Sequence, residues 1–387
     1  MSSSTPLDGF DKAIKRQFQD LTNQLRRRKI RGPDQCARET LLLLKRILGT
    51  VKWSNTKHMM DSVKAVGAAL VDARPMELTI GNIVRRVLLI IRENFAAAVS
   101  AEAQAGNGGG DEGGGGGLAL GLTAMRVGVG QAVSLAPSLE GVLREGAPVD
   151  FTAPVKNLMS SIMARVQDLE EELETGQDDI SDQAEDHIPD GAKILTFGRS
   201  RSVEMFFLAA AKKQRQFQVL VCEAAPHYGG TKMAKRLAAA GLDVTLITDA
   251  AAFAVMALVD KVFLPTHAVM ANGGLIAPSG SALVALAARE HAVPVVCITG
   301  LFKLCPLYPH DLDAFNELGS PAGVLEYEDS DRVMLTSATT TAEVLNPEYD
   351  FVPPETIDLF VTNTGGHQPS YVYRLLNECY HPDDRAL

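Results

Sequence analysis

The chain has 387 residues, more than one hydrophobic core usually organises, so its length favours two domains. Hydrophobic residues make up 46% and charged residues 22%, which is typical of globular proteins and excludes a disordered or fibrous class. The formal net charge of −10 opposes general attraction to nucleic acids and anionic membranes. We therefore expect no membrane contact and no direct binding of nucleic acid.

The amino-terminal residues MSSSTPLDGFDK lack the apolar core of a signal peptide, and the longest uncharged apolar run, at 250–259, is too short to span a bilayer. We therefore expect a soluble, cytoplasmic protein. The five cysteines form no CxxC pair and have no histidine at the spacing of a zinc site. They are interpreted as free, packed thiols, and no metal site is expected.

Apolar residues at three- and four-residue spacing predict amphipathic helices in the first third of the chain. These stretches are residues 7–25, 41–51, 59–70 and 79–93. Pro33 breaks the first of them, and four such helices predict a small bundle. The basic pair Arg85 and Arg86 lies beside the apolar face of the last helix, where it either solvates the helix or contacts a partner.

A glycine-rich segment, GNGGGDEGGGGG, follows at 106–117. It lacks the Lys and Ser/Thr of a phosphate-binding P-loop and follows no predicted strand. Its low complexity instead predicts a disordered insertion within an N-terminal helical domain at 1–150.

Helical spacing returns at 158–188, and we interpret 151–190 as a connecting amphipathic helix or helix pair with an acidic outer side. Its apolar stripe consists of Leu158, Ile162, Val166, Leu169, Leu173 and Ile180. A helix that links two domains can bury such a stripe on another chain. Leu169 and Leu173 are therefore candidate interface residues.

From residue 191 onward, short and continuously apolar runs alternate with helical stretches. The runs are 193–197, 217–222, 243–247, 261–265, 294–299 and 357–363, and the helical stretches are 203–213, 231–240, 250–258 and 281–291. Strands buried on both faces and joined by helices predict a parallel sheet with right-handed crossovers. We therefore predict an α/β protein in which the helical domain is followed by a Rossmann-like parallel-sheet domain at 191–387.

Sheets of this kind place ligand sites at the carboxyl ends of their strands. The turn at 198–202 has one glycine where a dinucleotide site needs GxGxxG, so no cofactor is expected. No strand end has the GxSxG of a serine hydrolase. His267 is interpreted as a surface or hydrogen-bonding residue. Arg199 and Arg201 flank the loop where a substrate phosphate would lie, and we favour a role for them at a protein interface or in local structure.

Several stretches resemble the alpha, beta and delta regulatory subunits of translation initiation factor 2B. They are GNIVRRVLLIIRE (81–93), ILTFGRSRSVEMFFLAAAKK (194–213), ITDAAAFAVM (247–256), ANGGLIAPSGSALVALAA (271–288) and the region from EYDFVPPE to CYHPDD (348–384). The resemblance implies a non-catalytic regulatory or scaffold subunit of the guanine nucleotide exchange factor for initiation factor 2. The implied partners are a delta-type pairing subunit, an alpha subunit, catalytic gamma and epsilon subunits, and initiation factor 2 through its own alpha subunit.

The same domain is similar to the methylthioribose 1-phosphate and ribose 1,5-bisphosphate isomerases, which use a catalytic Cys, a catalytic Asp and an Asn-Lys pair. When the isomerase motifs are aligned with this chain without gaps, the Cys falls on Gly198, the Asp on His267 and the Asn-Lys pair on Ala277-Pro278. Glycine cannot act as a thiol and proline cannot replace an ammonium, so we expect no catalytic residue. The alternative is a sugar-phosphate-binding sensor or isomerase-like enzyme, whose phosphate would lie at 279–281, before a predicted helix.

Overall fold

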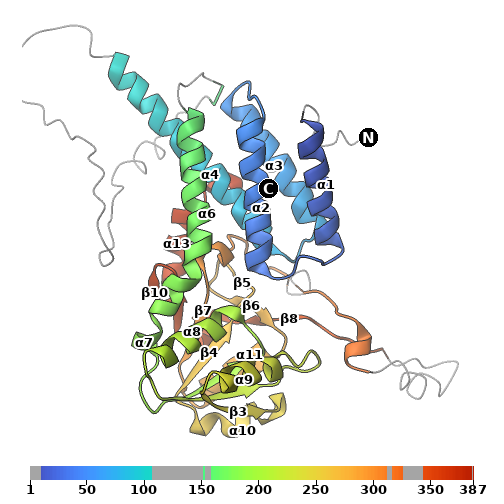
Figure 1. Cartoon of the computed structure of the whole chain (residues 1–387), viewed down its shortest axis with the longest axis vertical. Helices are drawn as coiled ribbons and strands as arrows, with labels where there is room; N and C mark the ends of the chain where they lie inside the picture. The colour runs from blue at the N-terminus through green and yellow to red at the C-terminus, as the bar shows by residue number, and fades with distance from the viewer. Residues whose placement is uncertain (1–9, 107–150, 153–157, 312–315, 326–342, 386) are drawn as a thin grey trace, which may run out of the picture.

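The structure is a computed structural model that describes residues 10–106, 151–152, 158–311, 316–325, 343–385 and 387. The glycine-rich insertion predicted at 106–117 lies outside these residues, apart from Gly106. Within the described ranges, no helix is long and apolar enough to cross a membrane. Figure 1 shows a group of helices at one end of the molecule and a sheet flanked by helices at the other.

The N-terminal helices confirm the predicted pattern. They are α1 (Lys12–Arg26), α2 (Pro33–Thr50), α3 (Thr56–Ala73) and α4 (Leu78–Gly106). Asp11 and Asn55 cap α1 and α3 through side-chain oxygens, and Pro33 occupies the first turn of α2, where a missing N–H costs nothing. Gly67 lets α3 approach α4, because a Cβ at this position would lie 2.6 Å from Cγ1 of Val84. The helices share one apolar core.

Helix α6 (Leu158–Asp182) runs from the helical group to the sheet and is followed by the short α7 (Ala184–His187) (Figure 1). It packs against α2 and α4, and no side chain of its apolar stripe is more than 9% exposed. The expectation that this stripe stays uncovered until a partner binds is therefore wrong. Leu169 and Leu173 belong to the core of the helical group and are only 3% and 5% exposed.

The main sheet has seven strands in the order β10-β9-β7-β4-β1-β2-β3, all paired in parallel except β10 with β9. The strands are β1 (Lys193–Phe197), β2 (Gln218–Cys222), β3 (Asp243–Ile247), β4 (Lys261–Pro265), β7 (Val295–Ile298), β9 (Leu359–Thr362) and β10 (Gly365–His367). The predicted parallel sheet is therefore confirmed, and β10 is an additional antiparallel edge strand that the sequence pattern did not predict.

Both faces of this sheet are covered, which explains why its strands are continuously apolar. One face packs against α7, α8 (Arg201–Lys212) and α9 (Gly229–Ala239), and the other against α10 (Ala252–Val255), α11 (Ser281–Glu290) and α13 (Val372–Cys379). Neighbouring residues of a strand point to opposite faces, as Ile194 and Leu195 of β1 do. The helix predicted at 250–258 is divided into the turns η1 (Asp249–Ala251), α10 and η2 (Met256–Leu258).

A second, antiparallel sheet of β5 (Ala268–Val269), β6 (Leu275–Pro278) and β8 (Tyr349–Val352) lies against the start of α4 through Leu78. These strands have two to four residues, too few to give a periodic signal, and were not predicted. Together with α6, this sheet connects the helical group to the main sheet.

Candidate functional site

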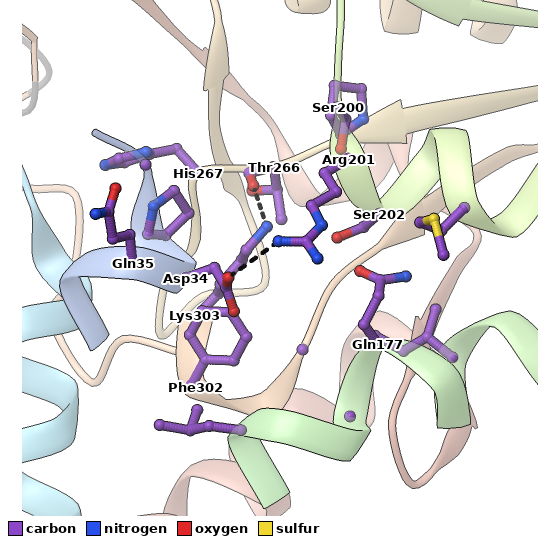
Figure 2. Close-up of a pocket in the computed structure, with 18 of the residues that line it drawn as sticks. Asp34, Gln35, Gln177, Ser200, Arg201, Ser202, Thr266, His267, Phe302 and Lys303 are labelled. Carbon is purple, nitrogen blue, oxygen red and sulfur yellow. Dashed lines mark hydrogen bonds and ion pairs between the residues drawn. The ribbon is translucent and has the colours of Figure 1, made fainter. Parts of the chain in front are cut away.

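A cleft of about 760 Å³ lies between the helical group and the carboxyl edge of the main sheet. The sheet contributes the turn after β1, Thr266 and His267 after β4, and Asn363 after β9. The helical side contributes Asp34 and Gln35 of α2 together with Gln177 of α6 (Figure 2). The expected convergence of strand ends is therefore confirmed for β1, β4 and β9.

The turn after β1 presents two arginines to this cleft. Gly198 has a φ of +64°, a conformation that favours glycine, and Ser200 caps α8 through the N–H of Val203. Arg199 lies 3.9 Å from Glu204 and Arg201 lies 3.7 Å from Asp34 on the opposite wall. Both guanidiniums remain substantially exposed, so they are free to contact a ligand or a partner.

Lys303 brings a buried positive charge to the same cleft (Figure 2). Its Nζ donates a 2.9 Å hydrogen bond to the carbonyl oxygen of Thr266 and forms no ion pair with any described residue. Burial lowers the pKa of this ammonium, although the charges of Cys297, Asp34 and Glu77 act in the opposite direction. The sequence reasoning missed Lys303, which follows β7 in the turn η3 (Leu301–Lys303); inspecting the end of that predicted strand would have found it.

His267 is held in a structural role. It is buried, its Nε2 lies 2.9 Å from the carbonyl oxygen of Met76, and its ring centroid lies 4.7 Å from that of Tyr349. A carbonyl oxygen can only accept, so Nε2 must carry the proton. Glu77 lies 3.6 Å from the same nitrogen. The hydrogen-bonding interpretation of His267 is confirmed, and the ring joins the sheet to the start of α4.

The phosphate site considered at 279–281 already contains a carboxylate. Oδ2 of Asp350 accepts hydrogen bonds from the N–H groups of Gly280 at 2.6 Å and of Ala282 at 3.2 Å. An anion at a helix N-terminus is favourable, and Asp350 supplies it from within the chain. Asp350 therefore occupies the position that the alternative, sugar-phosphate interpretation assigned to a phosphate.

Arg85 and Arg86 bind the chain's own elements. The Arg85 side chain is buried, and its Nη2 donates to the carbonyl oxygen of Arg385 at 2.9 Å. Arg86 forms a bidentate pair with Glu172 of α6 at 2.8 and 2.7 Å. The two roles expected for Arg85 and Arg86, solvating the helix or contacting a partner, are therefore both wrong. Their guanidiniums instead attach α4 to other parts of the same chain.

The cleft thus combines the exposed cations Arg199 and Arg201 with the buried Lys303. No cysteine is among the described residues that line the cleft. Nor do the described parts of the chain contain a cluster of three or more His, Cys, Asp or Glu side chains that could hold a metal ion. Such a site can attract an anion, because the exposed arginines and the buried Lys303 lie in the same cleft.

Comparisons with known proteins extend over nearly the whole chain. A model of the initiation factor 2 subunit family matches residues 29–110 and 119–369. Translation initiation factor eIF2B subunit beta of Dictyostelium discoideum is 41% identical over 371 residues, which cover 93% of this chain and 94% of that protein. The corresponding subunit of Schizosaccharomyces pombe is 38% identical over 385 residues, or 95% and 96% of the two chains.

Solved structures agree with this relationship. The crystal structure of eIF2B beta from Chaetomium thermophilum has a TM-score of 0.69 and 26% identity, and covers 100% of this chain and 99% of that one. A chain of the tetrameric eIF2B-beta2-delta2 complex from C. thermophilum has a TM-score of 0.66 and 25% identity, with coverages of 98% and 100%. A 5-methylthioribose 1-phosphate isomerase from Pyrococcus horikoshii shares the fold, with a TM-score of 0.56 and 17% identity over 94% of this chain and 87% of that one.

Proposed function

This chain belongs to the initiation factor 2 subunit family, and we propose that it is a non-catalytic, beta-type regulatory and scaffold subunit of the guanine nucleotide exchange factor for translation initiation factor 2. The observation that carries this proposal is the 41% identity to an eIF2B beta subunit along 93% of this chain and 94% of that protein. Similarity limited to the sheet would also fit an enzyme, because one fold hosts many functions.

A delta-type subunit is the proposed pairing partner, and the solved beta2-delta2 complex of C. thermophilum supports this choice. The alpha subunit, the catalytic gamma and epsilon subunits, and the alpha subunit of initiation factor 2 complete the proposed set of partners, in the cytoplasm. We propose the helical domain (1–150), the connecting helix (151–190) and the Rossmann-like domain (191–387) as the units that make these contacts. Arg199 and Arg201 remain candidates for a partner interface because both are exposed.

The proposed absence of catalysis rests on the residues at the positions that the resemblance assigns to the catalytic groups of the isomerases. Gly198 has no side chain, and Ala277 is buried and apolar. Pro278 carries no ionisable group, and Nε2 of His267 is bound to the carbonyl oxygen of Met76. An isomerase needs a group that moves a proton and another that stabilises the developing charge, and each is worth orders of magnitude in rate.

The purified chain is therefore expected not to isomerise methylthioribose 1-phosphate or ribose 1,5-bisphosphate. The measurement follows product formation at saturating substrate, with a catalytically active isomerase of this fold as the positive control. Turnover that disappears in a His267→Asn variant would show that the chain is an enzyme.

Binding of a phosphorylated sugar without turnover is a second candidate function. The observation in its favour is Lys303, a buried ammonium that lines the cleft and forms no ion pair with a described residue. A buried charge of this kind is costly unless a counter-charge is supplied. Isothermal titration with ribose 5-phosphate discriminates between the two functions: micromolar binding that is lost in Lys303→Met supports the sensor, and absence of heat supports the scaffold.

A further inference from the structure

The connection between α1 and α2 carries a dense positive charge. We call it the basic turn, and it consists of five exposed side chains: Arg26, Arg27, Arg28, Lys29 and Arg31. No acidic residue occurs at 21–33, although the whole chain has a formal net charge of −10. Figure 1 shows that this connection lies on the side of the helical group that faces the sheet. The basic turn is therefore a local surface of opposite sign to the protein as a whole.

The core of the helical group holds the backbone of the basic turn in place. Leu25 and Ile30 are buried in that core. Nη1 of Arg74 donates a 2.7 Å hydrogen bond to the carbonyl oxygen of Ile30, and Nε of Arg31 donates one of 3.2 Å to the carbonyl oxygen of Arg28. A ligand that binds the cations therefore does not have to order the loop that presents them, which reduces the entropic cost of binding.

The folded chain uses only part of this charge. Arg28 forms an ion pair with Glu317, whereas Arg26, Arg27 and Lys29 form no ion pair with any described residue. A cation in the last turn of a helix is favourable, and Arg26 fills that role in α1. The remaining cations are not needed for this purpose, and like charges so close together repel one another. Helix stability therefore does not account for the whole run.

The positive surface continues to the rim of the cleft. Arg31 lines the cleft together with Arg199 and Arg201 of the turn after β1. The guanidinium of Arg201 is 77% exposed and lies 3.7 Å from Asp34, in the first turn of α2. The start of α2 thus brings the basic turn and the arginines after β1 to the same side of the molecule. A ligand on the basic turn can extend toward these arginines.

The composition of the basic turn favours carboxylates as its ligand. Four of its five cations are arginines, whose planar guanidinium binds a carboxylate through two parallel hydrogen bonds. Asp20 and Asp34 border the turn along the chain, so a long polyanion such as RNA would meet negative charge on both sides. No aromatic residue occurs at 19–52, so the turn offers no ring on which the bases of a single strand could stack.

We propose that the basic turn is a docking site for an acidic segment of another protein, a short run of Asp and Glu residues that pairs with Arg26, Arg27, Lys29 and Arg31. Arg28 keeps its own partner, Glu317. Exposed ion pairs are individually weak, so several must act together and the binding must weaken with salt. The inference goes beyond the proposed function and does not depend on it.

The first test measures the fluorescence anisotropy of a labelled hexaglutamate peptide with the full chain at low salt. The triple variant Arg26→Glu, Arg27→Glu and Lys29→Glu should weaken binding by roughly tenfold or more, because like charges then face the peptide. Since all three positions are exposed, the variant should keep its circular dichroism spectrum.

The matched control reverses three exposed lysines elsewhere, Lys212 on α8 with Lys232 and Lys235 on α9. It changes the net charge by the same amount and should bind the peptide like the wild type. An equal loss in the control, or no binding by the wild type, would contradict the proposal. An oligouridylate that binds the wild type more tightly than the peptide does, and loses this binding in the triple variant, would identify the ligand as nucleic acid and overturn it.

The second test locates the partner by carbodiimide cross-linking of the chain purified with its partners from its own cells. The reagent joins a lysine amine to a carboxylate as an amide, with loss of water, only where the two groups are in contact. We expect Lys29 to be joined to an Asp or Glu of another protein, within an acidic run, and the Lys29→Arg variant to lose this cross-link. Cross-links of Lys29 to carboxylates of its own chain alone would contradict the proposal.

Discussion

Replacing Leu169 and Leu173 together with aspartate is expected to unfold the helical group. The two side chains are 3% and 5% exposed and belong to the core shared by α1–α4 and α6. Removing a buried leucine side chain costs about 2–5 kcal/mol, and placing a carboxylate in the apolar space costs more. The sum is comparable to the whole free energy of unfolding of a typical domain, about 5–15 kcal/mol. The measurements are the soluble yield and the circular dichroism melting curve.

The matched control for this variant is Ala164→Asp with Glu171→Asp, which changes two exposed positions of the same helix. It should fold normally, because surface substitutions away from special features rarely exceed about 0.5 kcal/mol. A Leu169→Asp, Leu173→Asp protein that melts like the wild type and fails only to bind its partner would contradict the structure. It would also restore the interface assignment that the sequence suggested.

Replacing Asp384 with alanine is expected to lower the free energy of unfolding by about 3–5 kcal/mol. Asp384 is fully buried near the C-terminus, and its carboxylate accepts hydrogen bonds from Nε and Nη2 of Arg92 at 2.7 and 3.0 Å. Nζ of Lys64 lies 2.7 Å from Oδ1. These contacts attach the end of the chain to α3 and α4, so the substitution leaves two cations facing each other without their counter-charge. Equilibrium unfolding in urea measures the loss.

The neighbouring Asp383 provides the control, since its side chain is 68% exposed. Asp383→Ala should change the free energy of unfolding by less than about 0.5 kcal/mol. Equal effects of the two substitutions would show that Asp384 does not hold the C-terminus in place.

The contribution of Asp384 to the free energy of unfolding should also depend on pH. Burial alone would raise the pKa of its carboxyl group, but hydrogen bonds from Arg92 and Lys64 and their charges hold the pKa below its ordinary value. The unfolded state therefore binds this proton more readily than the folded state. The stabilisation is complete above the unfolded pKa of about 3.9 and is lost as the pH falls through the lower folded pKa. The difference in free energy of unfolding between the wild type and the Asp384→Asn variant should accordingly shrink below about pH 4.

Local sequence patterns predicted most of the helices and the parallel strands because their signal lies within a few residues. Helical spacing of apolar residues placed α1–α4, and continuously apolar runs placed the parallel strands of the main sheet. Strands of two to four residues, such as β5 and β6, carry too little pattern to be seen. The stripe on α6 shows a different limit: periodicity identifies which side of a helix is apolar, but only the tertiary structure shows that α2, α4 and α8 cover it.

The candidate site was predictable to the extent that strand order determines it. The carboxyl ends of parallel strands meet at one edge, so Arg199, Ser200 and His267 could be placed together. Asp34 and Asp350 could not be assigned in this way, because each meets its partner across a long stretch of sequence. Arg85 was misinterpreted for the same reason, since the carbonyl groups that it binds lie 299 and 300 residues further along the chain.

Purification of the tagged chain from its own cells tests the proposed function most directly. The measurement combines mass-spectrometric identification of stoichiometric partners with guanine nucleotide release from initiation factor 2 in the same eluate. We predict delta-type, gamma and epsilon subunits in the eluate together with exchange activity, and no exchange activity from the isolated chain. A chain that elutes alone or only with enzymes of sugar metabolism, without exchange activity in the eluate, would contradict the assignment as a subunit of the exchange factor.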